Sequence, residues 1–389
     1  MTRKIAFFDT TLRDGIQAPG NFITWEKRVE VAKALEGLGV DEIEVGFPAV
    51  SDYEKKAVTE VAKAIEGTKA CFFARCNRED IRVAGEIGRG KSEVELLVCA
   101  SDILLNYKRR ISREENIREM TDSISFAHKY FDSVSVVFED ASRSDLDYLK
   151  LISETASGSG VEKIVLADTV GRSLPSEFGA LFSQVRQVIP NKTLLSAHCH
   201  NDIGLAVANS LAALENGATE VQTTFLGLGE RAGNAGIHSI LMALIAREES
   251  FNLNYGLDQK KVFSTSQKIA GIFAREIPKE APLIGENVFS TEAGMHQAAV
   301  LLNPITYEAV NPSEVGRSRR ICIGPFSGRK AILAIAGQLG YHITADTVEK
   351  IANYVKSKNK PVTEQELKCL LNQFLNYVNA TPGLMTSLR

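Results

Sequence analysis

The sequence predicts an α/β fold in which parallel strands close into a barrel, followed by a mainly helical second domain. Short apolar runs alternate with longer amphipathic runs about eight times over about 250 residues, which matches the number and length expected of a (β/α)8 TIM barrel. Parallel strands need crossover connections, and the amphipathic runs provide them as helices. From about Ala270 the pattern changes to loops and helices.

The predicted strands are short and mostly apolar. They are KIAFFD, EIEVGF, ACFFAR, VELLVCA, SVSVVF, EKIVLAD, TLLSAH and EVQTTF. Stretches such as TWEKRVEVAKALEGLG between them have the period of surface helices. A doubly wound open sheet is the alternative. It is disfavoured because no Gly-x-Gly-x-x-Gly follows the first strand, as a dinucleotide-binding fold would require.

We place the barrel at residues 1–265 and a linker with a helical subdomain at 266–389. The start of the second region is rich in loops and carries Glu292, His296 and Tyr307. Helical patterns follow, and Thr363 and Glu366 are spaced as a capping box at the start of the last helix.

The composition excludes several classes of function. The chain has 389 residues and a formal net charge of −3, so it offers no basic field for nucleic acid. It shows no signal-peptide pattern and no apolar run that could span a membrane. The six cysteines are scattered and form no Cys-x-x-Cys pair, as expected of a reduced cytoplasmic protein.

Two histidines end the seventh predicted strand. Because side chains alternate along a strand, His198 and His200 point the same way and Cys199 points to the other face. Two adjacent imidazoles at a strand end suit a divalent metal, although they could also be polar residues that simply end a strand.

Polar residues follow the carboxyl ends of most predicted strands, where a barrel enzyme has its active site. They are Asp9, Thr10, Arg13, Asp14, Gln17, Glu44, Arg75, Glu139, Asp140, Arg143, Asp168, Thr169, His198, His200, Glu230, Arg231 and Asn234. A solvated loop would explain any one of them, but not all of them on one rim.

Asp14, His198, His200 and Asn234 offer two imidazole nitrogens and two oxygens. This mixed set without thiolate suits Mg²⁺, Mn²⁺ or Zn²⁺. A 2-oxo acid could chelate such an ion, which would polarise its keto carbon.

The remaining rim residues allow two interpretations each. Arg13 and Arg75 could bind carboxylates or form salt bridges on the rim. Glu139 is a candidate general base or a partner for Arg143. His296 and Tyr307 lie outside the barrel and could be acid–base groups that a lid delivers, although His296 could also be a lone histidine in a loop.

At this point the sequence resembles the alkylmalate synthases, which comprise the homocitrate, isopropylmalate and citramalate synthases. The segments that carry the resemblance are DTTLRDGIQAPG, EVGFPAVS, EDASR, ADTVG, HCHNDIGLAVANSLAALENGA, GLGERAGNAG, EAGMH and NPITYEAVNPSEVGRS. The resemblance implies a metal-dependent Claisen-type condensation, in which a deprotonated acetyl-CoA methyl attacks the keto carbon of a 2-oxo acid and the thioester is hydrolysed.

The resemblance also implies roles for single residues. The metal positions match Asp14, His198, His200 and Asn234. The catalytic positions match Arg13, Glu139, His296 and Tyr307, with the histidine contributed across a homodimer. Substrate contacts are assigned to Arg13, Gln17, Arg75 and Thr169.

The length and several motifs most resemble the short homocitrate synthases, whose acceptor is 2-oxoglutarate. The chain departs from the family pattern at Ile16, Leu104, Thr291 and Pro325–Phe326. These departures leave open an isopropylmalate, citramalate or specialised-metabolism synthase of the phosphonomethylmalate type.

Two other classes compete with this interpretation. A metal-dependent lyase or aldolase on the same barrel uses related enolate chemistry. A non-catalytic metal-binding protein is disfavoured because Arg13, Glu139 and His296 are all present.

Overall fold

A computed structural model describes residues 3–88 and 92–379. The chain divides into two compact units. The first runs to Ile277 and includes Pro282–Ile284, and the second comprises Pro278–Ala281 and the residues from Gly285 on. Each unit is described by itself.

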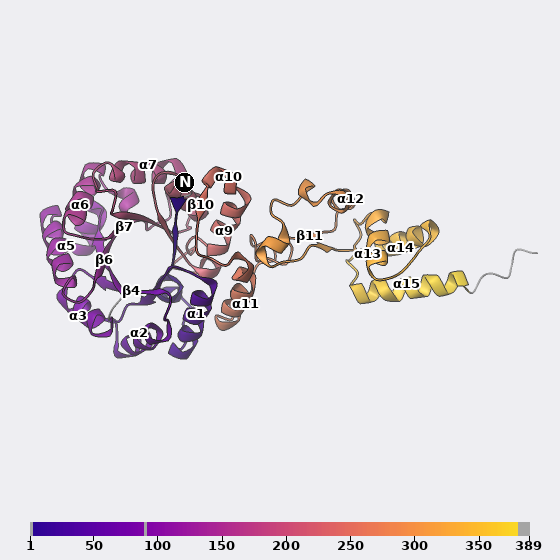
Figure 1. Cartoon of the computed structure of the whole chain (residues 1–389), viewed down its shortest axis with the longest axis horizontal. Coiled ribbons are helices and arrows are strands. Elements are labelled where there is room, and N and C mark those ends of the chain that lie inside the picture. The colour runs from indigo at the N-terminus through magenta and orange to yellow at the C-terminus, as the bar shows by residue number, and fades with distance from the viewer. Residues whose placement is uncertain (1–2, 89–91, 380–389) are drawn as a thin grey trace, which may run out of the picture. The chain divides into compact units, whose positions relative to one another are not determined.

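Eight parallel strands of the first unit form the predicted closed barrel (Figure 1). They are β2 (Ala6–Asp9), β3 (Glu42–Gly46), β4 (Lys69–Arg75), β5 (Glu93–Cys99), β6 (Ser133–Glu139), β7 (Lys163–Asp168), β8 (Leu194–Cys199) and β9 (Glu220–Thr223). The strands are neighbours in chain order, and β9 pairs with β2 to close the barrel. The fold predicted from the alternating apolar and amphipathic runs is therefore confirmed.

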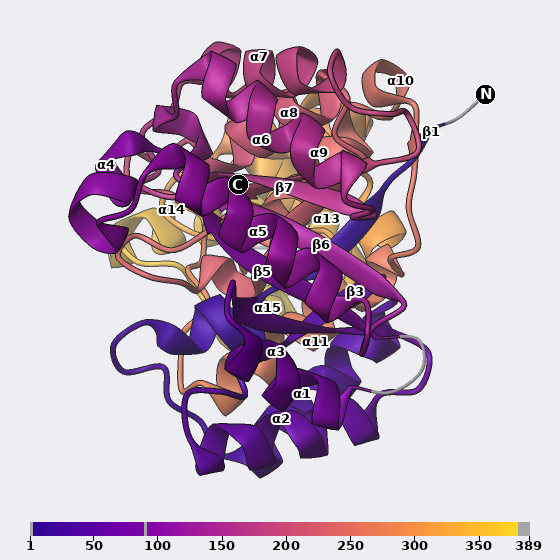
Figure 2. The ribbon, with the colours of Figure 1, turned by 90° about the vertical axis from the view of Figure 1, so that its left-hand side faces the viewer.

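A crossover helix follows every barrel strand, and helices lie on both sides of β3, β5, β6 and β7 in Figure 2. The main ones are α1 (Trp25–Leu38), α2 (Asp52–Ala64), α3 (Arg78–Ile87), α5 (Arg113–Ala127), α6 (Leu146–Gly158), α7 (Pro175–Arg186), α8 (Ala206–Glu215) and α9 (Ile237–Ala246). The shorter α4 (Asp102–Leu104) precedes α5, and α10 (Glu248–Phe251) and α11 (Val262–Ile272) follow α9.

Short helical turns lie between these elements, and two of them carry the rim residues Arg13, Asp14 and Arg143. The turns are η1 (Thr11–Gly15), η2 (Leu105–Arg109), η3 (Ala141–Arg143), η4 (Phe225–Gly227) and η5 (Gln259–Lys261). The turns η1 and η2 are π-helical, a conformation that is frequent at functional sites.

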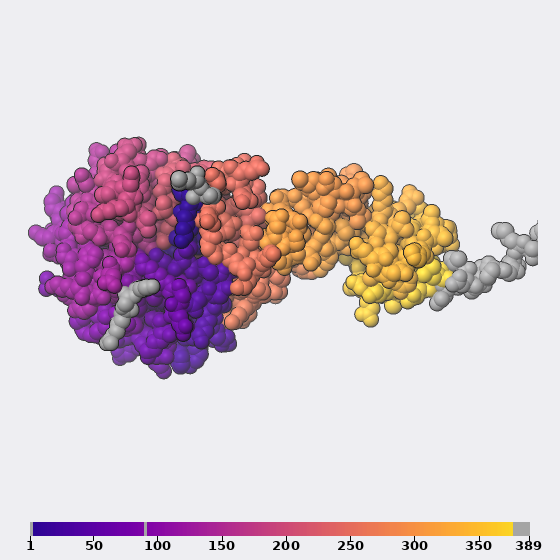
Figure 3. All heavy atoms as spheres, in the orientation of Figure 1, coloured from indigo at the N-terminus to yellow at the C-terminus, as the bar shows by residue number. Residues whose placement is uncertain are grey.

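The start of the described chain packs beside a segment that follows the barrel. The short strand β1 (Arg3–Lys4) pairs in parallel with β10 (Leu253–Asn254), and indigo and salmon atoms adjoin on the surface in Figure 3.

The second unit is mainly helical, as predicted. It contains β11 (Ser290–Thr291), α12 (Gly294–Leu302), η6 (Pro304–Thr306), η7 (Pro312–Val315), β12 (Arg320–Ile321), α13 (Arg329–Gln338), α14 (Ala345–Lys358) and α15 (Glu364–Asn379). Fully buried Ile332, Ile351 and Leu371 join α13, α14 and α15 in one apolar core. The segment around His296, expected to be a loop, contains α12, because backbone bonds to the loop before α13 fix its first turn.

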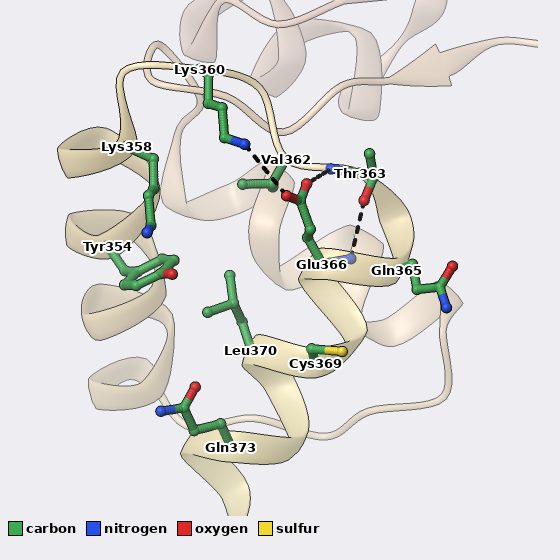
Figure 4. A pocket seen from close by; sticks show the side chains of 10 residues that line it. All are labelled: Tyr354, Lys358, Lys360, Val362, Thr363, Gln365, Glu366, Cys369, Leu370 and Gln373. Atoms are coloured by element: carbon green, nitrogen blue, oxygen red, sulfur yellow. Dashed lines mark hydrogen bonds and ion pairs between the residues drawn. The ribbon is translucent and has the colours of Figure 1, made fainter.

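The predicted capping box at the start of α15 is present (Figure 4). The amide of Glu366 donates to Thr363 Oγ1 at 3.1 Å, and the amide of Thr363 donates to Glu366 Oε2 at 2.7 Å. A hollow of about 530 Å³ lies beside this cap, between α14 and α15. None of the residues predicted to be catalytic, metal-binding or substrate-binding lines that hollow.

Within the described ranges, no helix is both long and apolar enough to cross a membrane.

Candidate functional site

The two histidines at the end of β8 face the same side, as their spacing predicted. Their Nε2 atoms lie 3.3 Å apart. Asp14, from η1, places Oδ2 at 3.2 Å from His198 Nε2 and at 3.6 Å from His200 Nε2. All three side chains are buried, and together they form a group that could hold a metal ion.

The tautomer of His198 fits a metal ligand. Its Nδ1 lies 2.8 Å from Gln222 Oε1, an atom that only accepts, so Nδ1 carries the proton and Nε2 keeps its lone pair. Gln222 is oriented because its amide nitrogen donates to Glu95 Oε2 at 2.9 Å. An outer hydrogen bond of this kind fixes a ligating imidazole and raises its basicity.

Asn234 adds an oxygen next to this group. Its backbone pairs with that of His200 in an isolated antiparallel bridge, so the two side chains come from neighbouring positions. The buried Asn234 Oδ1 has no hydrogen-bond partner among the described residues, and such an orphaned acceptor suits a cation. The donor set therefore fits the divalent metal that the sequence predicts.

The charge states also suit a cation. Burial acts to raise the pKa of Asp14, but the charge of Arg13 leads the contributions that hold that pKa well below its usual range. Burial, with His198 as a further contribution, lowers the pKa of His200 to about 4. Asp14 is thus a carboxylate and His200 a neutral imidazole at neutral pH.

Arg13 is held between acidic partners at the end of the first barrel strand. Its Nε lies 2.8 Å from Glu44 Oε2, and its Nη1 lies 3.4 Å from Asp14 Oδ2. The guanidinium also stacks over Phe73 at 4.7 Å. The turn that presents it is tied at its start, where Asp9 accepts from the amide of Thr11.

A cavity of about 220 Å³ opens beside the metal group. Its lining residues are Arg13, Asp14, Gln17, Phe47, Phe73, Leu97, Val137, Glu139, Ala167, Thr169, His198 and His200. Polar groups at or just beyond the carboxyl ends of β2, β6, β7 and β8 thus converge on one space that is otherwise walled by apolar side chains.

Glu139 enters this cavity from the end of β6 and pairs with a residue that the sequence did not single out. Lys108 Nζ lies 2.7 Å from Oε1 and 2.6 Å from Oε2 of Glu139. The expected alternative partner, Arg143, instead donates to Asp140 at 2.7 Å. Thr169 Oγ1 accepts from the amide of Asp140 at 2.8 Å, which joins β6 to β7.

Arg75 forms a salt bridge outside the cavity. Its Nε and Nη2 donate to the two carboxylate oxygens of Asp80 at 2.7 and 3.0 Å. It stacks 5.4 Å from the ring of Phe47 but is not one of the cavity-lining residues. The structure thus shows the salt-bridge alternative, while its contact with substrate stays a prediction.

Comparisons with known proteins agree with this geometry. Residues 4–269 match the HMGL-like family model. Residues 283–361 match the model described as homocitrate synthase post-HMGL domain-like. The chain belongs to the HMGL-like family.

Relatives that match almost the whole of this chain narrow the family further. A 2-isopropylmalate synthase of Pelotomaculum thermopropionicum is 36% identical over 98% of this chain and 77% of the relative. The 2-isopropylmalate synthase 1 of Caldanaerobacter subterraneus subsp. tengcongensis is 35% identical over 95% of this chain and 96% of the relative. These matches confirm the resemblance to alkylmalate synthases and identify the chain as an acyl-transferring condensing enzyme.

Solved structures support the fold alone. A hydroxymethylglutaryl-CoA lyase from Pseudomonas aeruginosa is 20% identical and covers 71% of this chain and 95% of the lyase, with a TM-score of 0.63. At this identity the likeness carries no argument for lyase activity.

Two predicted site residues of this alkylmalate synthase lie in the second unit. His296, on α12, stacks on Tyr307 with ring centroids 4.1 Å apart, and both side chains are exposed. Their mutual contact was not predicted, and their role stays a prediction.

Sequence reasoning missed Gln222, Glu95 and Lys108. Gln222 was within reach, because it sits in register with His198 on the neighbouring strand. The contact from Gln222 to Glu95 crosses the barrel from β9 to β5, and no sequence spacing reveals it.

Proposed function

We propose that this enzyme condenses acetyl-CoA with a 2-oxo acid whose side chain is apolar, as a 2-isopropylmalate synthase does. The observation that carries this proposal is the wall of the cavity, which consists of Phe47, Phe73, Leu97, Val137 and Ala167. A second carboxylate, as in 2-oxoglutarate, would lose hydration against this wall, and only Arg13 among the lining residues carries a positive charge.

This choice corrects the emphasis of the sequence analysis, which placed homocitrate synthase first. The relatives favour its 2-isopropylmalate alternative. The departures at Ile16 and Leu104 were expected to govern the acceptor, but neither residue is among those that line the cavity. We place acceptor selection at the apolar wall instead.

In the proposed reaction, Arg13 binds the keto oxygen of the acceptor. Glu139 takes a proton from the acetyl methyl group, and the resulting carbanion forms the new bond to the keto carbon. The electron pair of the C=O π bond moves to the keto oxygen, which then takes up a proton to become the hydroxyl group. Asp14, His198, His200 and Asn234 would hold Mg²⁺, Mn²⁺ or Zn²⁺, which supplies Lewis-acid polarisation of the acceptor when bound. Water then cleaves the thioester and releases CoA.

The test is CoA release with acetyl-CoA, a divalent metal and a panel of 2-oxoisovalerate, pyruvate, 2-oxoglutarate, oxaloacetate and phosphonopyruvate. We expect the highest kcat/KM with 2-oxoisovalerate. Replacing Leu97 by Ala should favour longer apolar acids by about 10-fold, the scale of one to two methylene groups in a pocket. Leu194→Ala, on an exposed side chain at the start of β8, is the matched control. Preference for 2-oxoglutarate would overturn the proposal.

We also propose that His296 and Tyr307 of one subunit complete the cavity of another in a homodimer. Inactive Glu139→Gln and His296→Ala proteins are mixed and allowed to exchange subunits. Action across the dimer restores activity, because one site of each mixed dimer then has both groups. No recovery in dimers shown to be mixed would contradict this arrangement.

A further inference from the structure

The ion pair between Glu139 and Lys108 differs from an ordinary surface ion pair. Both oxygens accept from one ammonium group, at 2.7 and 2.6 Å. The Glu139 side chain is only 18% exposed and faces the cavity, while Lys108 is 45% exposed. The lysine thus reaches from the surface to a group inside the site.

The segment that carries Lys108 is itself anchored to the strand end that carries Glu139. Ser101 donates to Asp140 Oδ2 at 2.5 Å, and its oxygen accepts from the amide of Leu104, the last residue of α4. The turn η2 continues directly from α4 and brings Lys108 back over Glu139. These contacts form a closed circuit, which runs from Glu139 through Asp140, Ser101 and η2 to Lys108 and returns to Glu139 through the ion pair.

Two residues in or beside this circuit, Asp140 and Arg110, have a left-handed backbone conformation. Asp140 has a left-handed φ of 65°, and Arg110, which ends η2, has a φ of 57°. Residues other than glycine adopt this conformation only where the surroundings determine it, and such positions concentrate at functional sites. Asp140 is fully buried and bonded to Ser101, Arg143 and Thr169, which accounts for its conformation.

We propose that Lys108 is a positioning residue for Glu139 and orients its carboxylate for removal of the acetyl methyl proton. The inference rests on the proposed role of Glu139 as the base. The proton passes from carbon to the Glu139 carboxylate, and Lys108 keeps its own proton throughout. The ammonium restricts the carboxylate to one orientation.

The neighbouring Arg109 provides a matched control. It lies on the same turn and pairs with Glu119 on α5, away from the cavity-lining residues. Removing its charge alters the electrostatics of η2 without touching Glu139.

The experiment measures steady-state kinetics of Lys108→Met, Lys108→Arg and Arg109→Met with whichever acceptor the wild-type enzyme uses best. We expect Lys108→Met to lower kcat by about 10- to 100-fold, the scale of misplacing a reacting group. Lys108→Arg should recover part of this loss, and Arg109→Met should stay within about twofold of wild type. The kinetic isotope effect with trideuterated acetyl-CoA should increase in Lys108→Met, because proton removal becomes slower.

A binding measurement separates positioning from substrate binding. In the Glu139→Gln background, adding Lys108→Met should leave the Kd for acetyl-CoA and for Mn²⁺ unchanged by calorimetry. A weaker acetyl-CoA Kd would make Lys108 a substrate-binding residue and overturn the proposal. An unchanged kcat or isotope effect in Lys108→Met would overturn it as well. The identity of the best acceptor tests the proposed function separately.

Discussion

The two ends of the barrel interior both bury charged groups, but they compensate them differently. At the amino ends of the strands, Lys163 is 1% exposed, and its Nζ lies 2.7 Å from Glu42, 3.1 Å from Glu93 and 3.0 Å from Glu220. At the carboxyl ends, Asp14 Oδ2 lies within 3.6 Å of the Nε2 atoms of His198 and His200, which are 3.3 Å apart.

The amino end therefore holds a buried cation in contact with three carboxylates, whereas the carboxyl end has, beside Arg13, a group of donor atoms that suits a further cation. Burial raises the pKa of Glu220 to about 7, with Lys163 opposing that shift. The contrast follows the division of labour in these barrels, in which the carboxyl end carries function and the amino end carries stability. The contrast also predicts that substitutions at the carboxyl end lower metal binding and activity, whereas substitutions at the amino end lower the stability of the fold.

The largest effect is expected from His200→Ala. Without this imidazole the donor set cannot hold the metal, so kcat/KM should fall by about 10³-fold or more, which corresponds to several kcal/mol of Lewis-acid stabilisation. Bound metal, measured on the dialysed protein, should fall in parallel. Glu139→Gln is the control, since it should lose turnover while keeping metal. Retention of metal by His200→Ala would contradict the assigned ligand set.

Lys163→Met should affect stability instead. It leaves Glu220 without a cation, whereas Glu42 and Glu93 keep their contacts with Lys69. Breaking a buried pair in this way costs about 3–5 kcal/mol. Urea unfolding monitored by circular dichroism measures the loss. The folded fraction should still bind metal with wild-type affinity. A double variant with Glu220→Gln should recover part of the stability, and an unchanged midpoint for the single variant would disprove the role of this network.

Acid should destabilise the carboxyl end through His238. Burial lowers the pKa of His238 to about 4, below the ordinary value of 6.5. The unfolded chain therefore binds more protons between these values, and stability falls as pH decreases from about 6.5 through about 4, by roughly 3 kcal/mol for this group. His238→Gln should flatten this part of the unfolding free energy against pH. Equal slopes for the two proteins would refute the assignment.

The smallest effect is expected from Gln222→Leu, which removes the outer hydrogen bond to His198 but no metal ligand. Loss of such a partner weakens metal binding by about 10- to 100-fold. Titration with Mn²⁺ measures the change, and activity should recover at high metal concentration. A loss of activity that excess metal cannot restore would show that Gln222 acts on the reaction in another way.

Periodicity in the sequence predicted the framework well. The alternation of strands and helices sufficed for the eight-stranded barrel, and the two-residue spacing placed His198 and His200 on one side. The same local logic predicted the capping box of Thr363 and Glu366. These features depend on residues close together in the chain, so the sequence displays them directly.

Contacts between distant residues were not predictable in this way. The partner of Glu139 is 31 residues away, and Gln222 reaches Glu95 over 127 residues. Even the pair of Arg75 and Asp80, only five residues apart, was not singled out, because the sequence left both a salt bridge and a substrate contact open for Arg75. In each case several charged or polar partners were possible, and local spacing did not choose among them.

By itself, the sequence determined the strand order, the faces of the strands and the types of ligand available to a metal. The tertiary structure alone decided that Lys163 neutralises the amino end, that Lys108 holds Glu139 and that apolar side chains wall the acceptor cavity. The physical reason is barrel closure, which brings side chains from non-neighbouring strands into one interior where burial makes each unpaired charge costly.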